Sequence, residues 1–251
     1  MFVVKTIDPD RACAPQLVDQ LRWLAHTLSR QLTAGLRHEK HETIHKARRC
    51  LKAIVAVIAL LHEPGKRRHV RAMRCTCRAA LHHLGSLRDQ QIINRLLPTI
   101  AGLHAQDITA RQRRSTLKIA LRLAENLRED VHRLRLRHGR RNARSALVKS
   151  REKTRHSAMI ALKRPTVVNL HDLRRQAQRL RLQEIILSDI VGMSHAQSES
   201  LKCLCADLGE HHDLANAMKH VNHDRMSARS SVVQLQILKL IPRLFGTAST
   251  A

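Results

Sequence analysis

Apolar residues recur at steps of three and four along nearly the whole chain, which is the period of an amphipathic helix. The stretch from 41 to 61 shows this most clearly, because Ile44, Leu51 and Ile58 fall on one side of a helix. The 8 glycines and 6 prolines fall mostly between such runs. The pattern predicts an all-α protein of about ten helices.

Several predicted helix ends carry start and stop signals. Ser86-x-x-Asp89 and Ser194-x-x-Gln197 each follow a helix-stopping glycine and have the spacing of an N-terminal capping box. We therefore expect both serines to open helices. A further helix end is expected at Gly209.

Two short motifs occur twice in the chain. The first motif is His45-x-x-Arg48-Arg49, and its copy is His171-x-x-Arg174-Arg175. The second motif is Leu84-Gly85-x-x-Arg88-Asp89, and its copy is Leu208-Gly209-x-x-His212-Asp213. Their order is the same in both occurrences, and their spacing is nearly so. The repeat predicts two helical halves, 1–138 and 139–251, each like a four-helix bundle and related by a pseudo-twofold axis. A groove or pore between them would be lined twice by the same residue types.

One face of the helix predicted around the first motif is cationic. It is formed by His41, His45, Arg48 and Lys52, within an arc of about 60°, with Arg49 beside them. Like charges at this spacing repel, so a polyanion that neutralises them is the expected partner. A merely solvated helix face is the alternative, and it is weakened because the second copy repeats the stripe.

A further row of arginines precedes the second motif. After the adjacent pair that opens it, its members follow at steps of three and four: Arg67, Arg68, Arg71, Arg74 and Arg78. Arg78 corresponds to Lys202 in the repeat. Exposed, solubilising arginines are the alternative interpretation of this row. Most cations of the chain are arginines, whose planar guanidinium groups bind phosphate oxygens in pairs, so phosphate is favoured over other anions.

Composition narrows the function classes. With 46 Lys+Arg against 20 Asp+Glu, the formal net charge is +26, while the hydrophobic content of 43% is too high for a disordered basic tail. With one Trp, two Phe and no Tyr, a β-rich fold and the stacking of single-stranded bases are disfavoured. No apolar run is long enough to span a bilayer, and the 6 cysteines are expected to be reduced, which predicts a cytoplasmic protein.

This ordered double set of motifs resembles the CHAD domain, a helical family named for its histidines. The resemblance covers nearly the whole chain. It implies two four-helix-bundle-like halves around a basic channel that binds inorganic polyphosphate, without catalysis and without a cofactor. The Glu-x-Glu-x-Lys signature of the CYTH domain, which often accompanies the family, is absent here, so a stand-alone form is expected.

The candidate polyphosphate-binding residues of the first half are His45, Arg48, Arg49, Lys52, Arg74, Arg78 and Arg88. Those of the second half are His171, Arg174, Arg175, Arg179, Arg181, Lys202 and His212. The second half departs from the family pattern: Gln178 stands at a usually basic position, and His212 stands where the first half has Arg88. We expect association with polyphosphate granules, and binding that strengthens at mildly acidic pH as histidines protonate.

Metal binding and catalysis are less favoured. His38, His41 and His45 have a permissive spacing for a metal, but the surrounding cations would repel it, so no metal is expected. Asp89 and Asp213 are expected to cap helices or to orient the basic residues rather than to act as general bases. Neither magnesium ligands nor a phosphate-cradling glycine-rich loop accompanies them.

The alternative function is non-specific nucleic-acid binding. A chain this basic gains affinity for any polyanion through counterion release. The sequence contains no helix-turn-helix, zinc-finger or basic-zipper pattern that would recognise bases. A narrow concave groove would favour polyphosphate, whereas a broad convex stripe would favour DNA.

Overall fold

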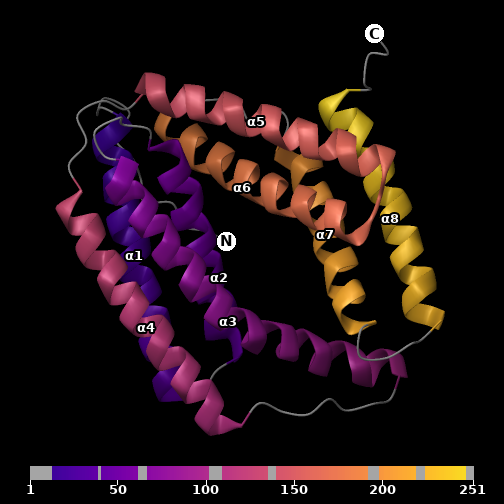
Figure 1. The fold of residues 1–251 in the computed structure, drawn as a ribbon, viewed down its shortest axis with the longest axis horizontal. Coiled ribbons are helices and arrows are strands. Elements are labelled where there is room, and N and C mark those ends of the chain that lie inside the picture. The colour runs from indigo at the N-terminus through magenta and orange to yellow at the C-terminus, as the bar shows by residue number, and fades with distance from the viewer. Residues whose placement is uncertain are drawn as a thin grey trace. The chain divides into compact units, whose positions relative to one another are not determined.

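The computed structural model describes residues 13–38, 41–61, 67–101, 109–134, 140–191, 198–218 and 224–246. Within these ranges the chain forms eight helices and no strand (Figure 1), which confirms the all-α class. The helices are α1 (Cys13–His38), α2 (His41–Leu60), α3 (Arg67–Ala101), α4 (Ala110–Arg133), α5 (Arg140–Lys163), α6 (Val167–Val191), α7 (Ser198–Ala217) and α8 (Asp224–Phe245).

Two of the predicted helix ends are wrong. Helix α3 continues through Gly85, and helix α7 continues through Gly209. Ser86 therefore opens no helix; its Oγ donates to the His83 carbonyl one turn earlier at 3.3 Å. Asp89 lies inside α3, so it has no capping role there.

Burial explains why these glycines do not end their helices. A glycine inside a helix costs about 1 kcal/mol relative to alanine. Leu84 and Leu87 lie on either side of Gly85 and are buried, and burying one such side chain contributes about 1.5–3 kcal/mol. The buried Leu208 stands in the same relation to Gly209. The other predicted capping box, at 194–197, lies outside the described residues.

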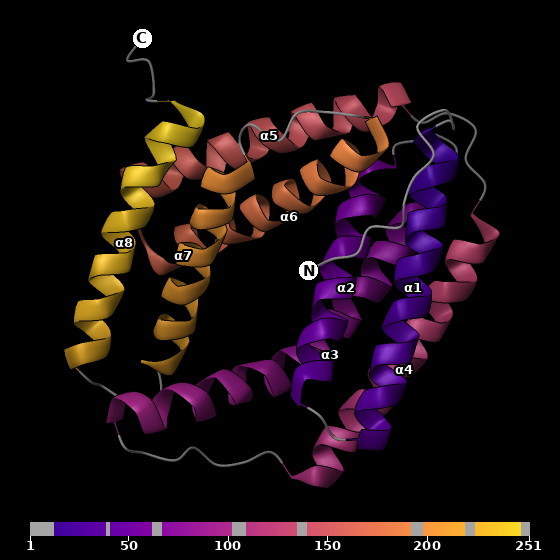
Figure 2. The same ribbon diagram turned by 180° about the vertical axis from the view of Figure 1, so that it is seen from behind.

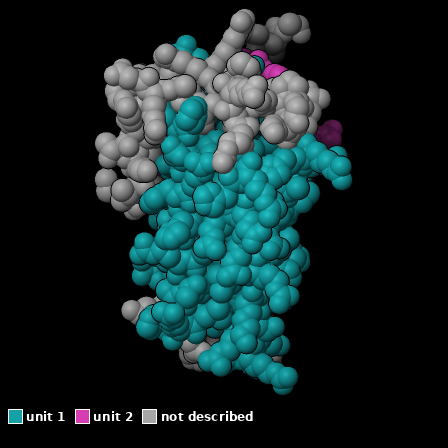
Figure 3. Space-filling model, turned by 90° about the vertical axis from the view of Figure 1, so that its left-hand side faces the viewer, with its two compact units in different colours: residues 1–91, 107–147, 185–194 teal, residues 92–106, 148–184, 195–251 magenta. Residues whose placement is uncertain are grey.

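The chain divides into two compact units, which Figure 3 colours separately. Unit 1 comprises Met1–Gln91, Asp107–Leu147 and Ile185–Ser194, and unit 2 comprises Ile92–Gln106, Val148–Glu184 and His195–Ala251. Unit 1 holds the first copies of both motifs, and unit 2 holds the second copies. The halves 1–138 and 139–251, their pseudo-twofold axis and their groove stay predictions.

In unit 1, α1 packs against both α2 and α4 (Figures 1 and 2). The buried face of α1 includes Leu17, Leu21, Leu24, Leu28 and Leu32. Gly35 of α1 lies where the three helices meet. A Cβ at this position would lie 2.9 Å from Thr43 Oγ1 of α2 and 3.8 Å from Leu117 Cδ1 of α4. The missing side chain is what permits this close approach.

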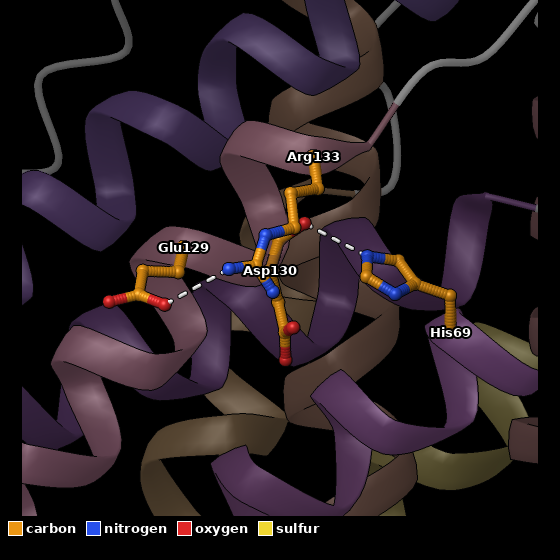
Figure 4. A network of polar contacts seen from close by, with 4 residues as sticks. All are labelled: His69, Glu129, Asp130 and Arg133. Carbon is orange, nitrogen blue, oxygen red and sulfur yellow. Dashed lines mark hydrogen bonds and ion pairs between the residues drawn. The ribbon is translucent and has the colours of Figure 1, made fainter.

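Helix α4 is capped at both ends. At its start, Thr109 and Gln112 form a capping box: each backbone N–H donates to the other side chain at 3.2 Å. At its end, His69 Nε2 of α3 lies 2.9 Å from the Asp130 carbonyl (Figure 4). Carbonyls in a last turn have no donor within their own helix, so the His69 N–H donates to Asp130 and joins α3 to α4.

In unit 2, α7 packs against α8, and α5 lies alongside α6 (Figures 1 and 2). Arg151 of α5 pairs with Glu184 of α6 at 2.9 Å, and Ser157 Oγ donates to Asp172 Oδ2 at 3.0 Å. The core of these helices includes Leu170, Leu173, Leu180, Leu201, Leu204, Val233, Ile237 and Ile241.

Candidate functional site

The first copies of the two motifs lie against each other in unit 1. Arg48 of α2 donates from Nη1 to the Leu81 carbonyl of α3 at 2.8 Å. Gly85 lies one turn after Leu81, and a Cβ at Gly85 would be 3.6 Å from the same nitrogen. The guanidinium of the first motif is therefore held beside the glycine of the second motif by a backbone acceptor.

His45 lies within the positive field of two helices. Its pKa is below the ordinary 6.5, first because of partial burial and then because of four cations: Arg88, Arg49, Lys52 and Arg48. Arg88 belongs to α3 and the other three belong to α2, so both motifs contribute to one group of charges. We call His45, Arg48, Arg49, Lys52 and Arg88 the first cluster. Its histidine is neutral at pH 7, and a bound anion would favour its protonation.

The second copies of the motifs also meet, in unit 2. His171 Nδ1 of α6 lies 3.2 Å from His212 Nδ1 of α7, with ring centroids 4.8 Å apart. Asn216 Nδ2 donates to His212 Nε2 at 3.1 Å. With that nitrogen accepting, neutral His212 carries its hydrogen on Nδ1 and donates it to His171. Neutral His171 then carries its own hydrogen on Nε2.

Carboxylates accompany the arginines of this second site. Arg174 Nη2 lies 3.8 Å from Asp213 Oδ1, joining α6 to α7, and Arg175 Nη2 lies 3.7 Å from Asp172 Oδ1. We call His171, Arg174, Arg175, His212 and Asp213 the second cluster. An anion that binds there has to share the arginines with these carboxylates, which lowers the attraction that it experiences.

The other candidate residues lie on the same helices. Arg74 and Arg78 are on α3, before the Leu81 that accepts from Arg48. Arg179 and Arg181 follow His171 on α6 by two to three turns. Viewed along the helix axis, they lie at about 80° to either side of it. Lys202 of α7 pairs with Glu199 of its own helix at 3.0 Å.

Three residues that contact candidates of the second half were not themselves among the candidates. Asn216 follows His212 by one helical turn, so the spacing of four residues is a signal that could have found it. Asp172 follows His171 directly and reaches Arg175 one turn on. Glu199 precedes Lys202 at the same helical spacing.

Other chemistry has little structural support. Among the residues that the structure describes, no group of three or more His, Cys, Asp or Glu could hold a metal ion. The His41 side chain, considered above for such a site, lies outside the described part. Burial raises the pKa of the Cys50 thiol to about 11 and that of Cys77 to about 12, so neither is a thiolate near neutral pH. Within the described ranges, no helix is long and apolar enough to span a membrane.

Comparison with known proteins identifies no relative. No family model, no curated protein and no solved structure matches the chain. The function is therefore inferred from the two clusters and from the motifs that form them.

Proposed function

We propose that this protein is a CHAD-domain protein that binds inorganic polyphosphate through the first and second clusters, without catalysing a reaction. The supporting observation is that each unit brings the same two motif positions together. His45 stands in the field of Arg88, and His171 contacts His212 at the corresponding position. The pseudo-twofold relation, a common basic groove and association with polyphosphate granules in the cytoplasm belong to the same proposal.

Arginine geometry suits this ligand. A guanidinium group presents its N–H donors as a planar fork that fits two phosphate oxygens. Arg48 is anchored by the Leu81 carbonyl, which limits its rotamers before any ligand arrives. Less side-chain entropy is then lost on binding. Released counterions supply a large share of the binding free energy, so affinity should fall steeply as salt rises.

The two clusters are expected to contribute unequally to the affinity for polyphosphate. In the first cluster, four cations act on one histidine. In the second cluster, Arg174 is paired with Asp213, and a titratable His212 replaces the permanently charged arginine. We infer that the first cluster contributes more of the affinity near neutral pH and that the second cluster gains in weight as pH falls.

A direct competition tests the proposal. Long-chain polyphosphate and duplex DNA are titrated against the protein by calorimetry at near-physiological salt, and then each is used to displace the other. Tight polyphosphate binding that DNA does not displace supports the proposal. If DNA displaces polyphosphate, the motifs are scaffold residues and only the net charge has to be explained.

A further inference from the structure

Another cationic surface, separate from the first and second clusters, lies on the exposed side of α4. Four basic residues follow one another there at steps of three or four, and all four are exposed: Arg111, Arg114, Lys118 and Arg122. At 100° and 1.5 Å per residue they fall within an arc of about 80° and span about 17 Å along the helix axis. We call this set the α4 stripe.

The core holds the stripe in a fixed orientation. The opposite side of α4 is buried through Leu117, Ala120, Ala124, Leu127 and Val131. Helix α1 packs against α4, and the Thr109–Gln112 capping box fixes the first turn. The four cations are therefore presented to solvent together, on a rigid helix of unit 1.

The charge distribution along α4 is unfavourable for an isolated helix. The first turn contains no acidic residue, although the N-terminal end of a helix favours negative charge. The cations stand one turn apart and repel one another. Acidic residues come only later on this side, at Glu125 and Glu129, and Glu129 pairs with Arg133 at 3.4 Å (Figure 4). The stripe thus ends at Arg122, and an anion along it would relieve the repulsion.

The surroundings of the stripe favour one class of polyanion. Ile119 is the only large apolar residue exposed among the described residues of α4, and 43% of its surface is exposed. One such residue offers too little apolar surface for insertion into a lipid surface. No Phe, Tyr or Trp lies on α4 to stack single-stranded bases. Ser115 and Asn126 are exposed beside the cations and can donate to phosphates or sugars.

We propose that the α4 stripe binds the phosphate backbone of double-stranded nucleic acid without recognising its sequence. A row of about 17 Å spans about five phosphates of one DNA strand, which follow one another at 3.4 Å along the duplex axis. The convex side of a helix can lie against a duplex, and it needs no groove. This activity goes beyond polyphosphate binding and uses none of the residues of the two clusters.

The test compares two charge-matched variants. The stripe variant carries Arg111→Gln, Arg114→Gln, Lys118→Gln and Arg122→Gln. The control variant removes four exposed cations from α5 in unit 2: Lys149→Gln, Lys153→Gln, Arg155→Gln and Lys163→Gln. Binding of fluorescein-labelled DNA duplexes of about 20 base pairs, in two unrelated sequences, is followed by anisotropy over a range of salt concentrations. Circular dichroism confirms that both variants keep their helices.

In the stripe variant, the slope of log affinity against log salt should become shallower by about 3–4, since each lost phosphate contact removes about one. Duplex affinity should fall about tenfold or more, equally for both sequences, while polyphosphate affinity changes less than about threefold. The control variant should keep nearly the parent slope.

Three results would overturn the proposal. The first is unchanged duplex binding by the stripe variant. The second is an equal loss in both variants, which would mean that net charge alone attracts DNA. The third is a loss of binding to polyphosphate or to phosphatidylserine vesicles with duplex binding intact, which would assign the stripe to another anion.

Discussion

His171 and His212 share one hydrogen bond, from Nδ1 to Nδ1 at 3.2 Å, at the positions where the first half has His45 and Arg88. That bond requires one nitrogen to donate and the other to accept, so it is compatible with a neutral pair. A second positive charge on rings 4.8 Å apart would cost on the order of 1–4 kcal/mol. Polyphosphate nearby would offset that repulsion, so its binding should be coupled to proton uptake.

The variant His212→Arg tests this coupling. It places the first-half residue in the second cluster and replaces a titratable group by a permanent cation. We expect it to bind polyphosphate more tightly than the parent at about pH 7.5, with less gain on acidification to about pH 5.5. Calorimetry in buffers of different ionisation enthalpy should show about one proton fewer taken up per binding event. Arg88→His is the reciprocal control and should increase proton uptake. Unchanged uptake in His212→Arg would rule out the pair as its source.

Acidification is expected to strengthen polyphosphate binding but, through His45, to lower the stability of the free protein. Its native pKa is below the ordinary value of 6.5, because of burial and the neighbouring arginines. Between the two values, the unfolded chain binds more protons, so stability falls as pH drops below about 6.5. The buried His211, whose pKa is also lowered by burial, acts in the same direction.

Thermal unfolding from about pH 7.5 down to 5.5 measures this effect. The Tm of His45→Gln should fall less than that of the parent, and His156→Gln, which changes an exposed residue of α5, should behave like the parent. Saturating polyphosphate should reduce the fall in the parent. An identical fall in His45→Gln and the parent would show that His45 does not contribute to acid sensitivity.

The proposed contacts predict a large loss of polyphosphate affinity in the quadruple variant Arg48→Ala, Arg49→Ala, Arg174→Ala and Arg175→Ala. A hydrogen bond to a charged group contributes about 1.5–3 kcal/mol, so polyphosphate affinity should fall about 100-fold or more. Helicity by circular dichroism should be unchanged. The matched control, Arg37→Ala, Arg128→Ala, Arg155→Ala and Arg243→Ala, removes four exposed arginines elsewhere and should bind nearly as the parent does. Equal affinities of the two quadruple variants would exclude the clusters as the binding site.

Gly35 should tolerate no side chain while Thr43 is present. In Gly35→Ala, the new Cβ would lie 2.9 Å from Thr43 Oγ1, and such overpacking costs about 1–3 kcal/mol. This cost outweighs the gain of about 1 kcal/mol in helix propensity. Urea unfolding should therefore show a destabilised variant, and adding Thr43→Ala should recover much of the loss. A Gly35→Ala protein more stable than the parent would contradict the close approach of α1 and α2.

At Gly85 and Gly209, in contrast to Gly35, substitution by alanine should stabilise the protein. A Cβ at Gly85 makes an ordinary contact of 3.6 Å with Arg48, and a Cβ at Gly209 meets no atom of the described residues within 4 Å. Gly85→Ala and Gly209→Ala should each raise stability by up to about 1 kcal/mol, because both positions are inside continuous helices. Destabilisation by both substitutions would indicate that the helices break at these glycines.

Much of the fold could be predicted because the signals for it are local. The period of apolar residues predicted an all-helical chain, and the stripe from Ile44 to Ile58 is buried in α2 as that period requires. Helix ends were predicted less well, because Gly85 and Ser86 carry strong local stop and start signals. Burial of Leu84 and Leu87 outweighs those signals, and a local pattern does not report on burial.

The sequence by itself determined the helical class, the double motif and the positions at which the basic residues gather. Helical period and repetition are properties of neighbouring residues, so they need no knowledge of the packed chain. Only the tertiary structure decided that Arg48 is held by the Leu81 carbonyl, that Arg174 faces Asp213 and that His212 contacts His171. These pairs lie on different helices, and their contacts depend on how two buried faces pack, which no single helix specifies.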